Sequence, residues 1–184
     1  AEEVRNIDPS KSYSTYVGKN YPINVFWGDT HLHTNLSWDA YNYGNRDLGP
    51  EEAYRFAKGE AIKASNGMMA KLRRPLDFLV IADHASNMGV MQGLANGNSD
   101  SKSSLLGQQW AERLEEIDES VDSDSTKSTK IYSQLALDGF LQGTAVNSNY
   151  RQSVWDNVAL LADANNSPGT FTAFIGYEWT QMFY

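Results

Sequence analysis

The chain contains no cysteine, and this absence excludes several kinds of site at once. Disulfide frameworks, thiolate zinc sites and cysteine nucleophiles all need the thiol group. Any metal ion that this protein binds must therefore be held by the imidazoles of histidine and the carboxylates of aspartate and glutamate.

Long apolar runs and basic runs are absent as well. No segment approaches the ~20 consecutive apolar residues of a membrane span, so no membrane span is predicted. Lys and Arg together number 15 against 23 Asp and Glu, which gives a net charge of −8. A nucleic-acid partner is not expected, because binding of the phosphate backbone needs a basic surface.

The residues that are present predict a folded domain. The chain has 184 residues, of which 41% are hydrophobic, and this is enough to bury a core. Residues 1–20 are polar and are interpreted as an N-terminal arm, with the folded part at 21–184. The sequence begins Ala-Glu-Glu, which resembles the start left by a signal peptidase. We therefore expect a periplasmic or secreted protein, with the cytoplasm as the alternative.

Three segments are predicted to be β-strands, at 23–29, 76–82 and 170–179. The second is almost uninterruptedly apolar, as in a strand buried on both faces of a parallel sheet. A helix is predicted to begin at Gly49-Pro50-Glu51-Glu52, because proline and acidic residues suit the first helical turn. Its apolar face is expected to comprise Ala53, Phe56, Ala57, Ala61 and Ala64.

Further helices are predicted at about 105–118, 130–142 and 151–164, with polar loops at 95–104 and 120–130. The order of strand, helix and strand with short connections is typical of the βαβ unit. The sequence therefore predicts an α/β fold with a parallel sheet.

Each predicted strand ends in polar residues that could bind a metal ion. The first carries Asp29, His31 and His33, the second Asp83 and His84, and the third Glu178. Because the carboxyl ends of parallel strands meet at one edge of a sheet, we expect these side chains to converge.

The chain has only 3 histidines, and all of them lie at strand ends beside acids. A single histidine is more often structural, but three in this placement favour a metal site. The spacing of His31 and His33 puts both imidazoles on one side of an extended chain. Neutral imidazole suits zinc, manganese and iron, and a carboxylate can bridge two ions.

Taken together, the motifs resemble those of the PHP (polymerase and histidinol phosphatase) metallohydrolases, and more closely an uncharacterised bacterial branch of that superfamily. The motifs are Gly28-Asp29-Thr30-His31-Leu32-His33-Thr34, Ser37-Trp38-Asp39, Asp83-His84 and Gly176-Tyr177-Glu178. The resemblance covers most of 24–90 and then 171–180, and it implies the N-terminal part of a distorted (β/α) barrel.

The resemblance also implies two or three divalent metal ions. His31 and His33 would bind the first ion, and Glu178 would bridge the first and the second. Asp39 would bind a third ion together with His84. Glu178 and His84 would thereby be catalytic.

Asp29 and Asp83 are expected to orient imidazole rings, with direct metal binding as the alternative. Asn87, Trp38 and Trp179 are candidates for a substrate pocket. The other aromatic residues near the ligands are assigned mainly to the core.

The chain also departs from the family pattern, because no histidine follows His84. Family members carry further histidines and a late Asp-x-His pair, and a complete barrel takes ~250 residues. We therefore expect the site to be completed by the remaining part of the same protein or by a second chain.

These features favour a metal-dependent hydrolase of phosphoester bonds that acts on a small phosphorylated molecule. One alternative is hydrolysis of amide, ester or sulfate bonds at the same metal centre. Another is a non-catalytic metal-binding or structural fragment. A serine nucleophile at Ser37 is disfavoured, because no Gly-x-Ser-x-Gly turn surrounds it.

Overall fold

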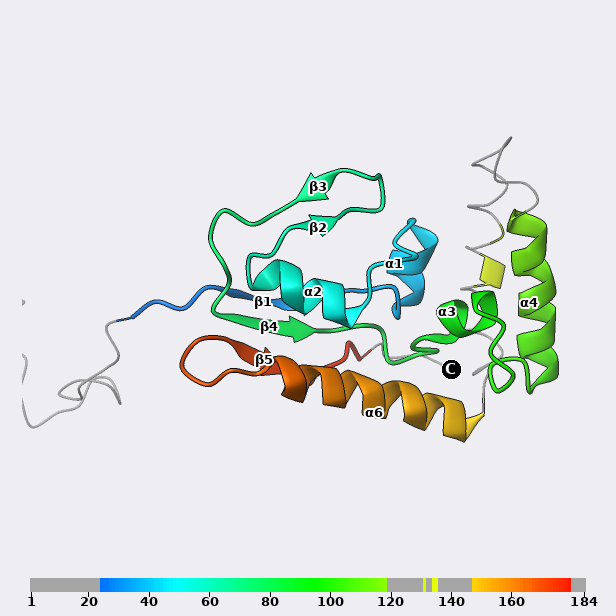
Figure 1. Ribbon diagram of the computed structural model, residues 1–184. Helices are drawn as coiled ribbons and strands as arrows, with labels where there is room; N and C mark the ends of the chain where they lie inside the picture. Colours follow the sequence, from blue (N-terminus) through cyan, green and yellow to red (C-terminus); the bar gives the residue numbers. More distant parts are fainter. Residues whose placement is uncertain (1–23, 119–130, 132–133, 136–146, 180–184) are drawn as a thin grey trace, which may run out of the picture.

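A three-stranded parallel sheet forms the centre of the fold (Figure 1). The computed structural model describes residues 24–118, 131, 134–135 and 147–179. The strands are β1 (Gly28–Leu32), β4 (Phe78–Ile81) and β5 (Thr172–Phe174), in the spatial order β1-β4-β5. The central position of β4 agrees with its apolar sequence.

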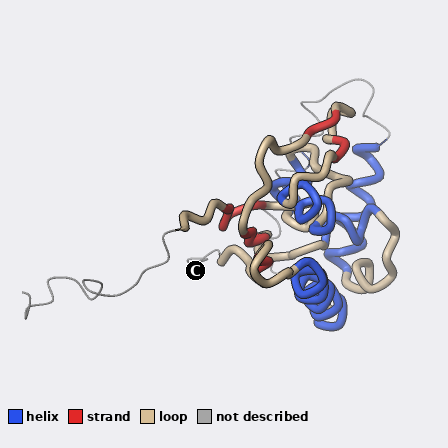
Figure 2. Tube along the Cα trace, turned by 60° about the vertical axis from the view of Figure 1, so that its left-hand side comes forward, coloured by secondary structure: helices blue, strands red, loops and turns tan. Residues whose placement is uncertain are grey.

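Two helices cover one face of this sheet. They are α2 (Pro50–Ala57) and α6 (Ser148–Asn165), which Figures 1 and 2 show beside the strands. Leu79 and Ile81 of β4 point to this face and are 0% and 2% exposed. They form a core cluster with Tyr54, Ala57, Ala162 and Phe171. Burial of these apolar side chains stabilises the layer of helices on the sheet.

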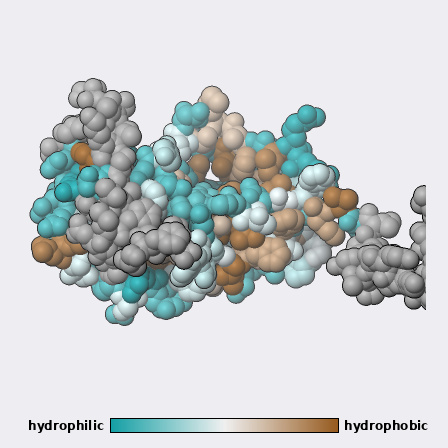
Figure 3. All heavy atoms as spheres, turned by 180° about the vertical axis from the view of Figure 1, so that it is seen from behind, coloured by the Kyte–Doolittle hydropathy of each residue, from teal (hydrophilic) through white to brown (hydrophobic). Residues whose placement is uncertain are grey.

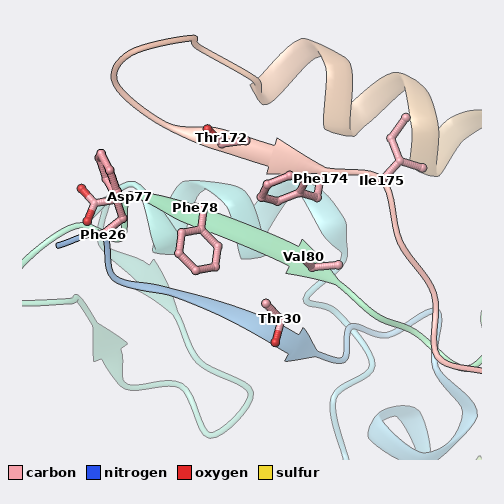
Figure 4. Close-up of a pocket in the computed structure, with 8 residues that line it drawn as sticks. All are labelled: Phe26, Thr30, Asp77, Phe78, Val80, Thr172, Phe174 and Ile175. Carbon is pink, nitrogen blue, oxygen red and sulfur yellow. The ribbon is translucent and has the colours of Figure 1, made fainter. Parts of the chain in front are cut away.

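Among the described residues, no helix covers the other face of the sheet. Side chains alternate along a strand, so Phe78 and Val80 point away from the two helices. With Phe174 of β5 they line an apolar hollow of about 700 Å³ (Figure 4). The view from behind shows hydrophobic side chains gathered on that side of the molecule (Figure 3). The described residues form no closed barrel.

A second core lies between α1 (Trp38–Asn42), α3 (Val90–Ala95), α4 (Leu105–Asp118) and the first turn of α6. The Tyr150 hydroxyl of α6 donates to the carbonyl of Gly89 at 2.7 Å. Gly89 has a φ of 72°, in the left-handed region that favours glycine. This contact fixes the segment between His84 and α3 against α6.

The predicted first helix is shorter than expected. It ends at Ala57, so Ala61 and Ala64 do not continue its face. The chain turns at Gly59, whose φ is 84°, and forms a small antiparallel pair of β2 (Ile62–Lys63) and β3 (Met69–Ala70). The alanine spacing was compatible with a helix, but the glycine turn ends it.

The first and third strands are also placed differently from the prediction. The β-rich residues 24–27 form no strand, and β1 itself carries His31. β1 begins at Gly28 because its pairing with β4 begins there, where Gly28 lies opposite Phe78. A Cβ atom at Gly28 would overlap Phe78, so only glycine allows this close approach. The third strand ends at Phe174, before Glu178.

The other predictions fare as follows. The α/β class with a parallel sheet is confirmed, as are the strand at 76–82 and the helices at 105–118 and 151–164. The arm at 1–20, the loop at 120–130 and almost all of the helix predicted at 130–142 lie outside the described residues. No helix within the described ranges has the length and apolarity required to span a membrane.

Candidate metal centre

The carboxyl ends of the three strands bring the predicted ligands together. His31 lies in β1 and His33 directly follows it, while His84 and Glu178 follow β4 and β5. Asp39 comes from the first turn of α1. A bridge between His84 and Glu178 extends the parallel pairing beyond the regular strands. Five side chains from three separate parts of the sequence thus meet at one edge of the sheet.

One group of ligand atoms is centred on Glu178. Its Oε2 lies 3.1 Å from Nε2 of His31 and 2.8 Å from Nε2 of His33. Both imidazoles lie on the same side of the extended chain, and β1 also departs from regular register with β4 between Asp29 and Leu32. Irregular steps of this kind re-aim side chains near functional sites. The three residues have the donor atoms and the spacing for a metal ion.

A second group is centred on Asp39. Its Oδ2 lies 3.0 Å from Nδ1 of His33 and 3.5 Å from Nε2 of His84. These three residues also have the spacing for a metal ion. His33 therefore belongs to both groups, with one ring nitrogen facing each carboxylate.

The electrostatics favour ionised carboxylates in both groups. Burial acts to raise the pKa of Asp39, but hydrogen bonds from Ser37, His33 and the amide of Ala40 outweigh it and hold that pKa below its ordinary value. Desolvation likewise acts to raise the pKa of Glu178, and the three imidazoles around it lower it overall. Ionised carboxylates are acceptors only, and they are the form that binds metal ions.

The surroundings of one atom, Nε2 of His33, suit a bound cation. Nε2 of His33 is buried and makes no hydrogen bond among the described residues, although Oε2 of Glu178 is 2.8 Å away. If Nδ1 of His33 donates its proton to Asp39, Nε2 carries a lone pair. A lone pair and an ionised carboxylate oxygen at this distance repel unless a proton or a metal cation lies between them. The residues present therefore fit a divalent ion here.

The same proton assignment separates the two groups. A neutral imidazole has one lone pair, so His33 serves the group of Glu178 and uses its other nitrogen to contact Asp39. Asp39 and His84 then remain for a separate ion.

Asp29 and Asp83, which are expected to orient imidazole rings, contact backbone and hydroxyl donors beside the histidines. Oδ1 of Asp29 accepts from the backbone amide of His31 at 2.8 Å. Asp83 is 1% exposed, and its two oxygens accept from the amide and the hydroxyl of Thr34. Both carboxylates therefore hold the backbone beside the histidines in place.

The candidate pocket residues lie in different places. Trp38 stacks on His84 with 5.2 Å between ring centroids and 20° between planes, so it borders the centre. Trp179 is 74% exposed and lines a smaller hollow with Trp155 of α6. Asn87 is half-buried in the segment before α3 and has a φ of 55°.

The assignment of the nearby aromatic residues mainly to the core is wrong. Trp27, Tyr43, Tyr177 and Trp179 are between 49% and 90% exposed, and only Tyr41 is buried. Composition alone could not show this, because exposure depends on which sheet face the helices cover.

Sequence reasoning missed the part that Ser37 plays. Its side chain is 0% exposed, and its Oγ contacts Asp39 at 2.5 Å and Nδ1 of His33 at 3.2 Å. The signal in the sequence is the position of this serine, two residues before the candidate ligand Asp39. Complete burial and these contacts leave Oγ no access to a substrate, which speaks against a nucleophile.

Comparisons with known proteins give a family and no activity. Residues 20–184 match a family model described as a protein of unknown function, DUF3604. A search of curated proteins found no match, and a search of solved structures found none either. Because the family model spans nearly the whole chain, including every ligand of the candidate metal centre, this chain belongs to the DUF3604 family.

Proposed function

We propose that this chain carries the centre of a metal-dependent hydrolase of phosphoester bonds. The observation that supports it best is that two candidate ligand groups lie side by side, with one ring nitrogen of His33 facing the carboxylate of each. Neighbouring divalent ions recur in enzymes that hydrolyse phosphoesters. The resemblance of the motifs to the PHP metallohydrolases supports the same reaction class.

Each residue has a role in this proposal. His31, His33 and Glu178 hold one ion, Asp39 and His84 hold another, and Glu178 also approaches Nδ1 of His84 at 3.5 Å. Divalent ions at such a centre activate water as the nucleophile and neutralise charge on the phosphoryl oxygens. No protein nucleophile is needed. The side chain of His31 is 64% exposed, so the centre opens to solvent on its side and admits a small substrate there.

We also propose that the sheet is the first part of a (β/α) barrel. In the part of the chain that the structure describes, helices cover one face, while Phe78, Val80 and Phe174 make the other face apolar and open. All-parallel sheets are ordinarily covered on both faces. Further parallel strands, from the same protein or a second chain, would cover the open face and supply the remaining ligands.

The test compares metal content and hydrolysis in the wild-type protein and in the variants His31→Ala and Glu178→Gln. The protein is loaded with Zn²⁺ or Mn²⁺ and assayed with phosphomonoesters and phosphodiesters. We expect the wild type to bind at least two ions and each variant to lose bound metal and more than about 100-fold in turnover. Glu60→Gln is the matched control, because Glu60 is an exposed glutamate paired with Arg55 at 2.8 Å.

Parallel assays with amide, carboxylic ester and sulfate ester substrates distinguish the bond classes. Turnover of one of these in place of phosphoesters would keep the metal centre and overturn the phosphoester assignment. Metal binding without turnover of any substrate, in the protein together with the strands that complete the sheet, would support a non-catalytic role. Unchanged metal content in both ligand variants would overturn the centre itself.

A further inference from the structure

The hydroxyl of Ser37 joins three residues of the metal centre. Its Oγ lies 2.5 Å from Oδ1 of Asp39 and 3.2 Å from Nδ1 of His33, and it accepts from the backbone amide of His84 at 3.2 Å. These partners come from α1, from the end of β1 and from the segment after β4. Ser37 itself is fully buried at the N-cap of α1.

The chemistry of these partners determines where the hydroxyl proton goes. The amide of His84 is a donor and occupies a lone pair of Oγ, so the hydroxyl proton is directed to another partner. The short contact to Oδ1 of Asp39 makes that carboxylate the acceptor. Nδ1 of His33 then finds only acceptors around it, namely Oγ of Ser37 and both oxygens of Asp39. That nitrogen must therefore carry a proton.

The same bonds determine how Asp39 is turned. Its Oδ1 accepts from Ser37 and from the amide of Ala40 at 2.7 Å. Its Oδ2 is left facing Nδ1 of His33 and Nε2 of His84. When one oxygen of a carboxylate is held by hydrogen bonds, the other oxygen points in a fixed direction. Residues that hydrogen-bond to metal ligands commonly orient them in this way.

We propose that Ser37 is a positioning residue that orients Asp39 and, through it, keeps the proton of His33 on Nδ1, so that Nε2 of His33 is free for a metal ion. This role rests on the proposed metal centre, although the proton position on His33 is a property of the metal-free protein as well. Ser37 contacts no substrate, so it is not a catalytic residue.

The experiment uses Ser37→Ala, with Ser101→Ala as the matched control. Ser101 is also 0% exposed and donates its hydroxyl proton, but to the carbonyl of Asn98, far along the chain from the centre. Two quantities are measured in the whole protein. One is the ¹⁵N chemical shifts of the imidazole rings at fixed pH without metal, which report the protonated nitrogen. The other is the affinity for Zn²⁺, by competition with a chelator.

We expect the wild type and Ser101→Ala to show His33 protonated on Nδ1. Ser37→Ala should show a mixture of the two tautomers and should bind Zn²⁺ about 10–100-fold more weakly. With only 3 histidines in the chain, the ring signals can be assigned by single substitutions. If Ser37→Ala does not fold, Ser37→Gly is measured in the same way, since glycine also lacks the hydroxyl and is tolerated at a helix N-cap.

The outcomes separate the two proposals. Wild-type ring shifts and wild-type Zn²⁺ affinity in the Ser37 variant would overturn the role of Ser37. Absence of Zn²⁺ binding by the wild type would overturn the proposed metal centre, while the ring shifts would still decide the role of Ser37. A change equal to that of Ser101→Ala would show a general effect of losing a buried hydroxyl, and would also overturn the role of Ser37.

Discussion

Four acidic side chains lie beside the three histidines, and their contacts give them different roles. Glu178 and Asp39 face imidazole nitrogens. Asp29 and Asp83 face backbone amides. Sequence position alone does not separate these two roles. The distinction is decided by which donor each carboxylate reaches.

Replacing Asp83 by alanine should destabilise the fold. The amide and the hydroxyl of Thr34 are buried with Asp83 and would be left without an acceptor. An unsatisfied buried donor costs about 1–3 kcal/mol, so we expect a loss of about 3 kcal/mol in the free energy of unfolding. Urea denaturation measures it. Asp29→Ala is the control and should cost less than about 1 kcal/mol, because Asp29 is exposed; equal losses would contradict this reasoning.

At the scale of secondary-structure elements, the position of Glu178 depends on the approach of β5 to β4. The strands pair from Phe78 with Thr172 to Val80 with Phe174, and the pairing resumes where His84 and Glu178 form a bridge. Between these points the chain passes Val80 at Gly176. A Cβ atom at Gly176 would overlap Cγ1 of Val80 and lie 3.3 Å from the carbonyl of Ile81.

Gly176→Ala should therefore move the segment that carries Glu178. We expect a loss of about 1–3 kcal/mol in the free energy of unfolding, as for other overpacked positions, together with weaker Zn²⁺ binding. Both are measured by denaturation and chelator competition. The double variant Gly176→Ala with Val80→Ala makes room for the added methyl group and should recover much of the Zn²⁺ affinity. Failure of the second substitution to restore it would show that the overlap with Val80 is not the cause.

The sequence predicts a helix or strand correctly where its apolar pattern and its length both fit that element. It does not predict the ends of elements that are set by pairing with a distant strand. The apolar run at 76–82 predicted β4, and the long periodic segments predicted α4 and α6. The apolar pattern predicts that the helix from Pro50 continues through Gly59, but the backbone turns there to form the β2–β3 pair. β1 was placed too early, because the hydrogen-bonding partner that defines a strand lies elsewhere in the sequence.

At the scale of the whole molecule, the two faces of the sheet differ. One face is sealed by α2 and α6 around Leu79 and Ile81. The other presents Phe78, Val80 and Phe174 around a hollow of about 700 Å³. Apolar surfaces of this kind mark places where another polypeptide or a ligand binds.

The open face should bind the fluorescent dye ANS in the isolated 184-residue chain. Phe174 is 48% exposed there, so Phe174→Asp should reduce the dye fluorescence several-fold. Leu160→Asp is the control, because Leu160 is 65% exposed on α6 and does not line the hollow. No dye binding by the wild type would show that this face is already covered, and would contradict its completion by further strands.

By itself, the sequence determined the α/β class, the apolar central strand and the identity of the side chains able to bind a metal. These follow from residue types and short-range spacing, which local physical chemistry governs. Only the tertiary structure decided that Glu178 faces three imidazoles, that Asp83 supports Thr34 and that Ser37 joins three residues of the centre. Those contacts join residues up to 147 positions apart, and strand register and helix packing fix them rather than any local pattern.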